Sequence, residues 1–166
     1  MKKSKLLFYF LLIPLFSLTF QSCSDDEESY EEWRKENDAY INKIKEDGYL
    51  VATIPGGPGP VYYEIINGAE SGIGTYPIYT SKVKVRYKGS LINDTVFDDA
   101  SERTVDFNVN ELTKGFAVAL QNMQVGEKWK IYVPWDLGYG SSGRGSIILP
   151  YSALIFELEL LEISQI

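Results

Sequence analysis

The sequence predicts an α+β protein in which one short helix covers one face of an antiparallel sheet, preceded by an amphipathic helix. Apolar residues recur at three- and four-residue steps over residues 28–47, which is the period of a helix. After residue 60 they alternate with polar residues in several short runs, and one helical segment lies between these runs. With 166 residues, 45% of them hydrophobic, the chain is long enough for one domain and an appendage, and too short for a large multidomain enzyme.

The N-terminal 22 residues have the features of a signal peptide. Three lysines form a basic start, and residues 6–20 form an apolar run that is short for a membrane-spanning helix. Cys23 follows where cleavage would make it the first mature residue, so the segment resembles a bacterial lipoprotein leader with Cys23 as the acylated residue, although Phe20 and Gln21 depart from the usual lipobox. A retained anchor and a secreted product with a free thiol are the alternatives.

Acidic residues follow Cys23 directly. The run Ser-Asp-Asp-Glu-Glu at residues 24–28 resembles the export tag that sends some Gram-negative lipoproteins to the cell surface, and it is equally consistent with a solvated, flexible tether. The helix predicted over residues 28–47 places Glu31 to pair with Lys35, and Gly48 ends it. We expect its aromatic stripe to pack on the domain or on a partner.

Proline and glycine dominate residues 54–60, which are predicted to form a loop or hinge. Beyond it, Leu112, Phe116, Ala119 and Leu120 give the segment 112–122 an apolar helical face. The segments predicted to be strands are 61–66, 83–88, 106–110, 129–133 and 153–163. The predicted organisation is therefore a signal peptide (1–22), a tether with helix and loop (23–60) and a folded domain (61–166).

The composition excludes several kinds of chemistry. Without histidine, no catalytic arrangement can use a histidine base, and a single cysteine excludes an internal disulfide and a CxxC redox or zinc site. The net charge of −7, which becomes more negative once the leader is removed, leaves no basic surface for phosphates. We therefore expect no nucleic-acid partner, no metal and no cofactor.

Four ordered motifs identify the folded domain more closely. They are VKVRYKGSL from residue 83, VFDDASER from residue 96, ELTKGFAVALQNMQVGEKWKIYVP from residue 111, and LGYGSSGRGSIILPYSALIFELELLEI from residue 137. In this order and spacing they resemble the FKBP-type peptidyl-prolyl cis-trans isomerase domain over residues 83–163. The resemblance implies an antiparallel half-barrel sheet wrapped on one short helix, with a hydrophobic pocket between them.

The resemblance also implies which positions form that pocket. The catalytic positions would be Tyr87, Phe97, Asp98, Tyr139 and Phe156. The substrate-binding positions would be Arg103, Glu111, Leu112, Thr113, Phe116, Ile147 and Ile148. In this reading the backbone N–H of Thr113 donates to the substrate carbonyl, Arg103 is the charge partner of Asp98, and Tyr139 supplies a hydroxyl.

Four positions depart from the family pattern. Phe116 replaces the usual Trp, Thr113 the usual Ile, Val105 a common Phe and Leu149 the first Pro of an Ile-Pro-Pro turn. A smaller floor and one lost ring predict a roomier pocket that binds macrolides less well than the family does.

The predicted function is prolyl isomerisation of exported proteins by a lipoprotein of the outer membrane, facing the periplasm or the outside. The reaction needs no proton transfer and therefore suits a chain without histidine. The expected partners are prolyl-containing polypeptides and the membrane, through a lipid on Cys23. Two alternatives stay open: a non-catalytic binding module or chaperone that kept the fold, and a homodimer formed through the helix that contains Trp33.

Overall fold

The structure is a computed structural model that describes residues 24–68 and 74–165. The predicted signal peptide and Cys23 lie outside the described residues. In the part of the chain that is described, no helix is long and apolar enough to cross a membrane.

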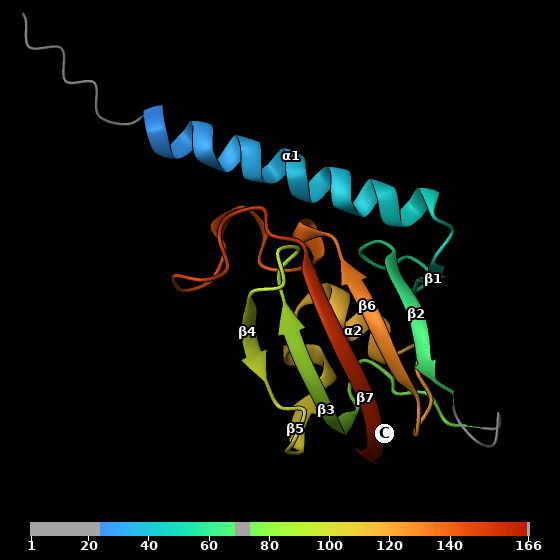
Figure 1. Cartoon of the computed structure of the whole chain (residues 1–166). Helices are drawn as coiled ribbons and strands as arrows, with labels where there is room; N and C mark the ends of the chain where they lie inside the picture. Colours follow the sequence, from blue (N-terminus) through green and yellow to red (C-terminus); the bar gives the residue numbers. More distant parts are fainter. Residues whose placement is uncertain (1–23, 69–73, 166) are drawn as a thin grey trace, which may run out of the picture.

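In these described ranges the fold consists of two helices and a seven-stranded sheet (Figure 1). The helices are α1 (Ser24–Glu46) and α2 (Lys114–Leu120), and short 3-10 turns are η1 (Val109–Glu111), η2 (Trp135–Leu137) and η3 (Gly140–Ser142). The strands are β1 (Leu50–Ala52), β2 (Val61–Asn67), β3 (Lys82–Ser90), β4 (Val96–Asp99), β5 (Val105–Asn108), β6 (Lys128–Val133) and β7 (Leu154–Gln165). They pair antiparallel in the order β1-β2-β6-β7-β3-β4. Strand β4 pairs with residues 88–90 of β3, and β5 pairs with residues 82–85 of the same strand.

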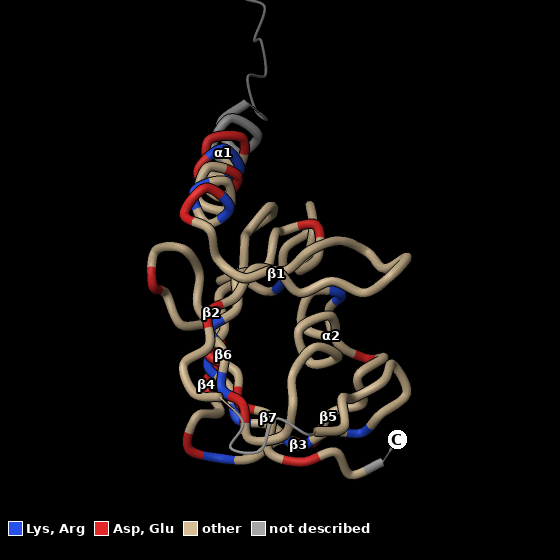
Figure 2. The backbone as a smooth tube through the Cα atoms, turned by 90° about the vertical axis from the view of Figure 1, so that its right-hand side faces the viewer, with Lys and Arg blue, Asp and Glu red and all other residues tan. Residues whose placement is uncertain are grey.

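The inner face of the sheet curves around α2, as the tube view shows (Figure 2). Alternation along β6 turns Trp129, Ile131 and Val133 into this core, where they are buried with Phe116 and Leu120 of α2. The predicted half-barrel wrapped on one short helix is therefore confirmed.

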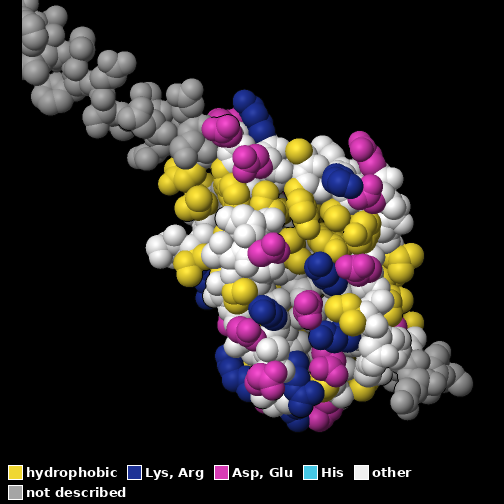
Figure 3. All heavy atoms as spheres, viewed as in Figure 1, with side chains coloured by type: hydrophobic (Ala, Val, Ile, Leu, Met, Phe, Trp, Pro, Cys, Tyr) yellow, Lys and Arg dark blue, Asp and Glu magenta, His cyan; other side chains and the backbone are white. Residues whose placement is uncertain are grey.

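The outer face of the sheet carries α1 at one end. Ile41 and Ile44 are buried against Tyr132 of β6 and Ile155 of β7, and an apolar band lies between α1 and the sheet (Figure 3). The apolar stripe of the helix thus packs on its own domain, which is one of the two arrangements expected from the sequence. Away from α1, cross-strand ion pairs such as Lys84–Glu162 at 2.7 Å occupy the solvated part of this face.

Several details differ from the sequence-based expectations. The helix begins at Ser24, so the backbone of the acidic run forms its first turns. Glu31 pairs with Arg34 at 3.6 Å instead of with Lys35. Gly48 ends the helix with φ of +79°, as predicted. Strands β1 and β4 were not predicted, because they are too short to show a period.

Candidate functional site

A cavity of about 840 Å³ opens between the inner face of the sheet, the N-terminal end of α2 and the segment that follows η2. Its walls combine aromatic rings with a few polar side chains, which is the usual composition of a ligand pocket. The lining residues are Tyr87, Phe97, Asp98, Phe107, Glu111, Leu112, Thr113, Phe116, Tyr139, Arg144, Gly145, Ser146, Ile147, Ile148 and Phe156. Eleven of the twelve positions implied by the family resemblance are among them, and Arg103 is not.

The floor of the cavity is a set of phenyl rings packed edge to face. Phe116 lies at 90° to Phe156 with ring centroids 5.0 Å apart, and Phe97 lies at 88° to Phe156 at 5.5 Å. This is the arrangement that the quadrupoles of aromatic rings prefer. The three rings come from β4, α2 and β7, so the fold has to be complete before the floor exists.

Gly89 explains how Phe97 and Phe156 come so close. A Cβ at this position of β3 would lie 2.5 Å from the Phe97 ring and 2.9 Å from the Phe156 ring. The glycine therefore provides the space in which the two rings meet across the sheet.

One wall carries a hydrogen bond between two family positions. The Tyr87 hydroxyl donates to Asp98 Oδ2 at 2.5 Å. Burial, the hydrogen bond to Asp98 and the charge of that carboxylate raise the pKa of Tyr87, so the phenol stays protonated and remains a donor. The tyrosine in turn fixes the orientation of the Asp98 carboxylate at the cavity wall.

Arg103 lies in the turn between β4 and β5, where its N–H donates to Ala100 O at 3.4 Å. Within the described residues, no ion pair at 4.0 Å or less joins Asp98 to Arg103, and the hydrogen-bond partner of the Asp98 side chain is the Tyr87 hydroxyl. The Arg103 charge still acts at longer range, since it opposes the rise in the pKa of Tyr87.

Phe107 was not singled out from the sequence, and it supplies the ring that Val105 lacks. Both residues lie on the same face of β5, because they are two positions apart on a strand. The Phe107 ring packs at 82° to Phe116, at 6.2 Å, and at 45° to Tyr87. The ring predicted to be lost is therefore present, and the signal that would have found it is the strand period at Val105.

Tyr139 lies at the opposite wall with Arg144, another residue that the sequence analysis missed. Arg144 Nη1 donates to the Tyr139 hydroxyl oxygen at 2.7 Å, and the guanidinium lies over the ring at 5.1 Å. Because a phenol can accept one hydrogen bond and donate another, the Tyr139 proton remains available to a ligand carbonyl. Arg144 lies in an irregular loop, where no periodic signal marks it.

The mouth of the cavity is formed by two short segments. Glu111, Leu112 and Thr113 join η1 to α2, and Ile147 and Ile148 come from the loop after η3. Ile148 is buried, whereas Ile147 is 46% exposed and presents its side chain at the rim. Among the described residues, the Thr113 N–H has no acceptor within hydrogen-bonding distance, which leaves it available as a donor.

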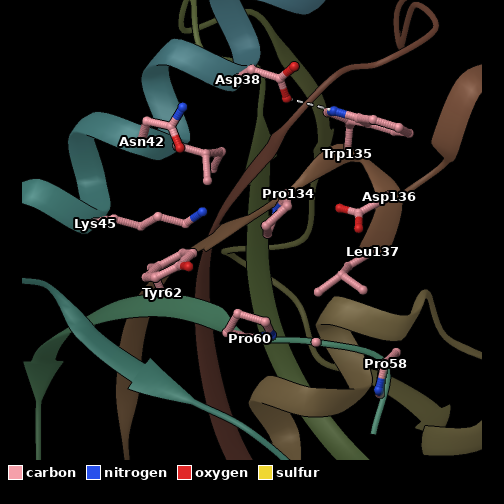
Figure 4. A pocket seen from close by; sticks show the side chains of 12 residues that line it. Asp38, Asn42, Lys45, Pro58, Pro60, Tyr62, Pro134, Trp135, Asp136 and Leu137 are labelled. Atoms are coloured by element: carbon pink, nitrogen blue, oxygen red, sulfur yellow. Dashed lines mark hydrogen bonds between the residues drawn. The ribbon is translucent and has the colours of Figure 1, made fainter.

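A second, smaller cavity of about 320 Å³ lies between α1, the loop before β2 and η2 (Figure 4). Three prolines and Tyr62 contribute to its walls, and Asp38 of α1 accepts a hydrogen bond from Trp135 at one end. Neither cavity contains a cluster of three or more potential metal-binding side chains within the described part of the chain.

Comparisons with known proteins agree with this geometry. Residues 75–161 match the family model of FKBP-type peptidyl-prolyl cis-trans isomerases. The FKBP-type 22 kDa peptidyl-prolyl cis-trans isomerase of Escherichia coli K12 is 42% identical over 111 residues, which are 60% of this chain and 54% of that protein. The outer membrane protein MIP of Legionella longbeachae is 34% identical over 137 residues, which are 81% of this chain and 56% of that protein.

A solved structure shares the fold over most of its length. The crystal structure of a peptidyl-prolyl cis-trans isomerase from Pseudomonas syringae superposes with a TM-score of 0.71 and 29% identity, covering 81% of this chain and 96% of that one. This chain spans about half the length of the two curated relatives above.

Proposed function

Because the chain belongs to the FKBP-type peptidyl-prolyl cis-trans isomerase family, we propose that it catalyses the cis-trans isomerisation of X-Pro bonds in exported proteins as they fold at the cell envelope. The observation that carries this proposal is the floor of edge-to-face phenyl rings beside the Tyr87–Asp98 hydrogen bond. The floor is an apolar surface on which a prolyl ring can pack, and the walls carry polar groups that can form hydrogen bonds with the peptide on either side of it.

The reaction is a rotation, so the site has to favour a twisted amide. The barrier of about 18–20 kcal/mol arises because the amide loses resonance as it twists, and no bond breaks. The carbonyl of the twisted amide is less polar than that of the planar amide. A cavity lined by Phe97, Phe116 and Phe156 removes water that would stabilise the planar form, and so favours the transition state over the ground state.

Polar groups on opposite walls would hold the peptide while it rotates. The Tyr139 hydroxyl, whose oxygen accepts a hydrogen bond from Arg144, donates a hydrogen bond to one substrate carbonyl, and the Thr113 N–H donates one to another. Asp98, oriented by Tyr87, accepts a hydrogen bond near the twisting bond. None of these steps transfers a proton, which fits a site without histidine.

We further propose that residues 1–22 are removed as a signal peptide and that Cys23 is lipidated, so that the protein is anchored in the outer membrane. The basic and apolar leader followed by the single cysteine supports this, as does the name of the Legionella relative, an outer membrane protein. A homodimer through α1 would use the exposed side of the helix, because Ile41 and Ile44 are buried against the chain's own sheet.

The test is the proline-limited refolding of an unrelated protein in the presence of residues 24–166. We expect acceleration, with Phe97→Ala and Tyr139→Phe each lowering kcat/KM about tenfold, since each removes an interaction worth roughly 1.4 kcal/mol in the transition state. Tyr79→Phe removes a hydroxyl from an exposed position outside the cavity and is the matched control.

Acceleration by the wild type that only the two cavity variants reduce would establish the isomerase and its site. A folded wild type that binds a prolyl peptide without accelerating refolding would instead support the alternative of a non-catalytic binding module, which the replacement of the family's Trp by Phe116 favours. Equal activity in all variants would place catalysis outside the cavity.

A further inference from the structure

The pocket wall formed by the segment between β6 and β7 has little regular structure of its own. Residues 134–153 contain two 3-10 turns, one isolated bridge between Arg144 and Ile148, and Tyr151 in the left-handed region with φ of +62°. This segment nevertheless carries Tyr139 and Ile148 of the cavity. Besides the burial of Leu137 and Ile148 in the core, contacts at its ends therefore contribute to fixing its position.

Helix α1 contacts the start of this segment. Asp38 Oδ1 accepts a hydrogen bond from Trp135 Nε1 at 2.8 Å (Figure 4). The Arg34 guanidinium lies 5.2 Å from the Trp135 ring centroid and 4.9 Å from that of Tyr151, and these two rings pack edge to face at 5.1 Å. One arginine of α1 thus contacts both ends of the segment at once.

The same face of α1 fixes the end of the segment through a buried amide. Asn37 is fully buried, its Oδ1 accepts a hydrogen bond from the Ala153 N–H at 2.8 Å, and its Nδ2 donates to Trp33 O at 2.7 Å. Trp33 Nε1 donates to Ser152 Oγ at 3.0 Å, and Ser152 Oγ donates to Leu149 O at 2.7 Å. A buried polar group with both of its functions satisfied fixes a geometry more strictly than apolar contact does.

This attachment reaches the cavity through one further bond. The Tyr151 N–H donates to Gly140 O at 2.9 Å, so the end held by α1 is joined to the residue that follows Tyr139. At the same time Leu149 O, held by Ser152, directly follows Ile148 of the cavity wall. The contacts of α1 are therefore continuous with two residues that would touch substrate.

We propose that α1 is part of the isomerase site, and that Asn37 and Trp33 are positioning residues that hold the Tyr139 and Ile148 wall against the substrate. This inference rests on the proposed isomerase function. The four residues involved, Trp33, Arg34, Asn37 and Asp38, lie on one side of the helix because they are spaced by one turn. The tether to the envelope and the catalytic wall are then parts of one packed unit.

The experiment compares variants of residues 24–166 by refolding kinetics and by amide hydrogen exchange. Asn37→Ala leaves the Ala153 N–H buried without its partner, and Trp33→Phe removes the bond to Ser152 while it keeps a ring. Ile44→Ala is the stability control, since Ile44 lies two turns further along α1 in the cluster with Tyr132. Lys35→Ala, on the exposed side, is the baseline.

We expect Asn37→Ala to lower kcat/KM about tenfold, and Trp33→Phe to lower it less, at a temperature where all variants are folded. Exchange of the Tyr151 N–H should become faster in both. Ile44→Ala should change neither property, although it lowers the free energy of unfolding at least as much as Asn37→Ala does.

Two results would overturn the inference. One is unchanged kcat/KM and unchanged exchange of the Tyr151 N–H in folded Asn37→Ala and Trp33→Phe. The other is an equal loss of kcat/KM in Ile44→Ala, which would mean that general stability is responsible. An inactive wild type would defeat the proposed function alone. In that case faster Tyr151 exchange confined to Asn37→Ala and Trp33→Phe would still support the attachment, and unchanged exchange would contradict it.

Discussion

At the scale of single residues, the site depends on the absence of a side chain at Gly89 as much as on its aromatic rings. Gly89 lies in the middle of β3, where a side chain would normally stabilise the strand. Because Gly89 has no side chain, the rings of Phe97 and Phe156 can approach each other across the sheet, with their centroids 5.5 Å apart. Glycine weakens the strand at this position, but it leaves the space in which the floor of the cavity forms.

We predict that Gly89→Ala destabilises the protein by about 1–3 kcal/mol, as overpacking usually does, and lowers isomerase activity more than Phe97→Ala does. The new methyl group would meet two rings at 2.9 Å or less, and both rings have to move. Chemical denaturation measures the first effect and refolding kinetics the second.

Gly68→Ala is the matched control, because a Cβ there has open space around it. If Gly89→Ala matched this control in stability and activity, the close approach of the rings would have no energetic role. The comparison separates the shape of the site from the general effect of replacing a glycine.

Most cavity residues could be predicted from the sequence because they lie in motifs with fixed spacing. Phe107 and Arg144 could not be predicted this way, for different reasons. Phe107 takes a ring position that the motif assigns to Val105, and only the strand register shows that both point inward. Arg144 reaches Tyr139 through a loop conformation that depends on tertiary contacts.

At the scale of elements, α2 is placed by its close approach to β6. A Cβ at Gly115 would lie 2.3 Å from Val133 Cγ1 and 3.3 Å from Leu137 Cβ, so the helix backbone rests directly on the strand. The next residue is Phe116, whose ring forms the cavity floor. The depth of the floor is therefore set by the distance between α2 and β6.

We predict that Gly115→Ala pushes α2 away from β6, lowers the free energy of unfolding by about 1–3 kcal/mol and reduces activity. The double variant Gly115→Ala/Val133→Ala removes the obstructing methyl groups and should recover part of both losses, although Val133→Ala alone is destabilising. A double-mutant cycle in chemical denaturation measures this coupling. Strict additivity of the two changes would show that the contact does not position the helix.

The elements differ in how much the sequence says about them. The strands from β2 onward that exceed five residues, and both helices, follow from the period of their apolar residues. The start of α1 was placed too late, because the acidic residues before residue 28 show no apolar period. Strands β1 and β4 depend on pairing with β2 and β3, which no local pattern reveals.

At the scale of the whole molecule, the sheet separates two apolar clusters, and each contains a tyrosine that donates a hydrogen bond to a carboxylate. On the inner face Tyr87 donates to Asp98, and on the outer face Tyr132 donates to Glu64 at 2.8 Å beneath α1. Burial, and then the hydrogen bond to a carboxylate, raises the pKa of both tyrosines. Each phenol is thus held in its neutral form by the folded state.

These raised pKa values predict that stability falls at alkaline pH. In the unfolded chain tyrosine ionises near pH 10, whereas in the folded protein Tyr87 and Tyr132 keep their protons to higher pH. Above about pH 10 the folded state binds more protons than the unfolded state, so the free energy of unfolding decreases as pH rises. The upper limit is about 1.4 kcal/mol per pH unit for each tyrosine, and solvent screening reduces it.

Chemical denaturation between pH 8 and 11 measures this dependence. Tyr132→Phe should be less stable than the wild type at pH 8, because it leaves Glu64 without its hydrogen bond, and should lose stability less steeply above pH 10. Tyr79→Phe, at an exposed position, should follow the wild type throughout. A Tyr132→Phe curve parallel to that of the wild type would mean that this phenol has the same pKa in both states.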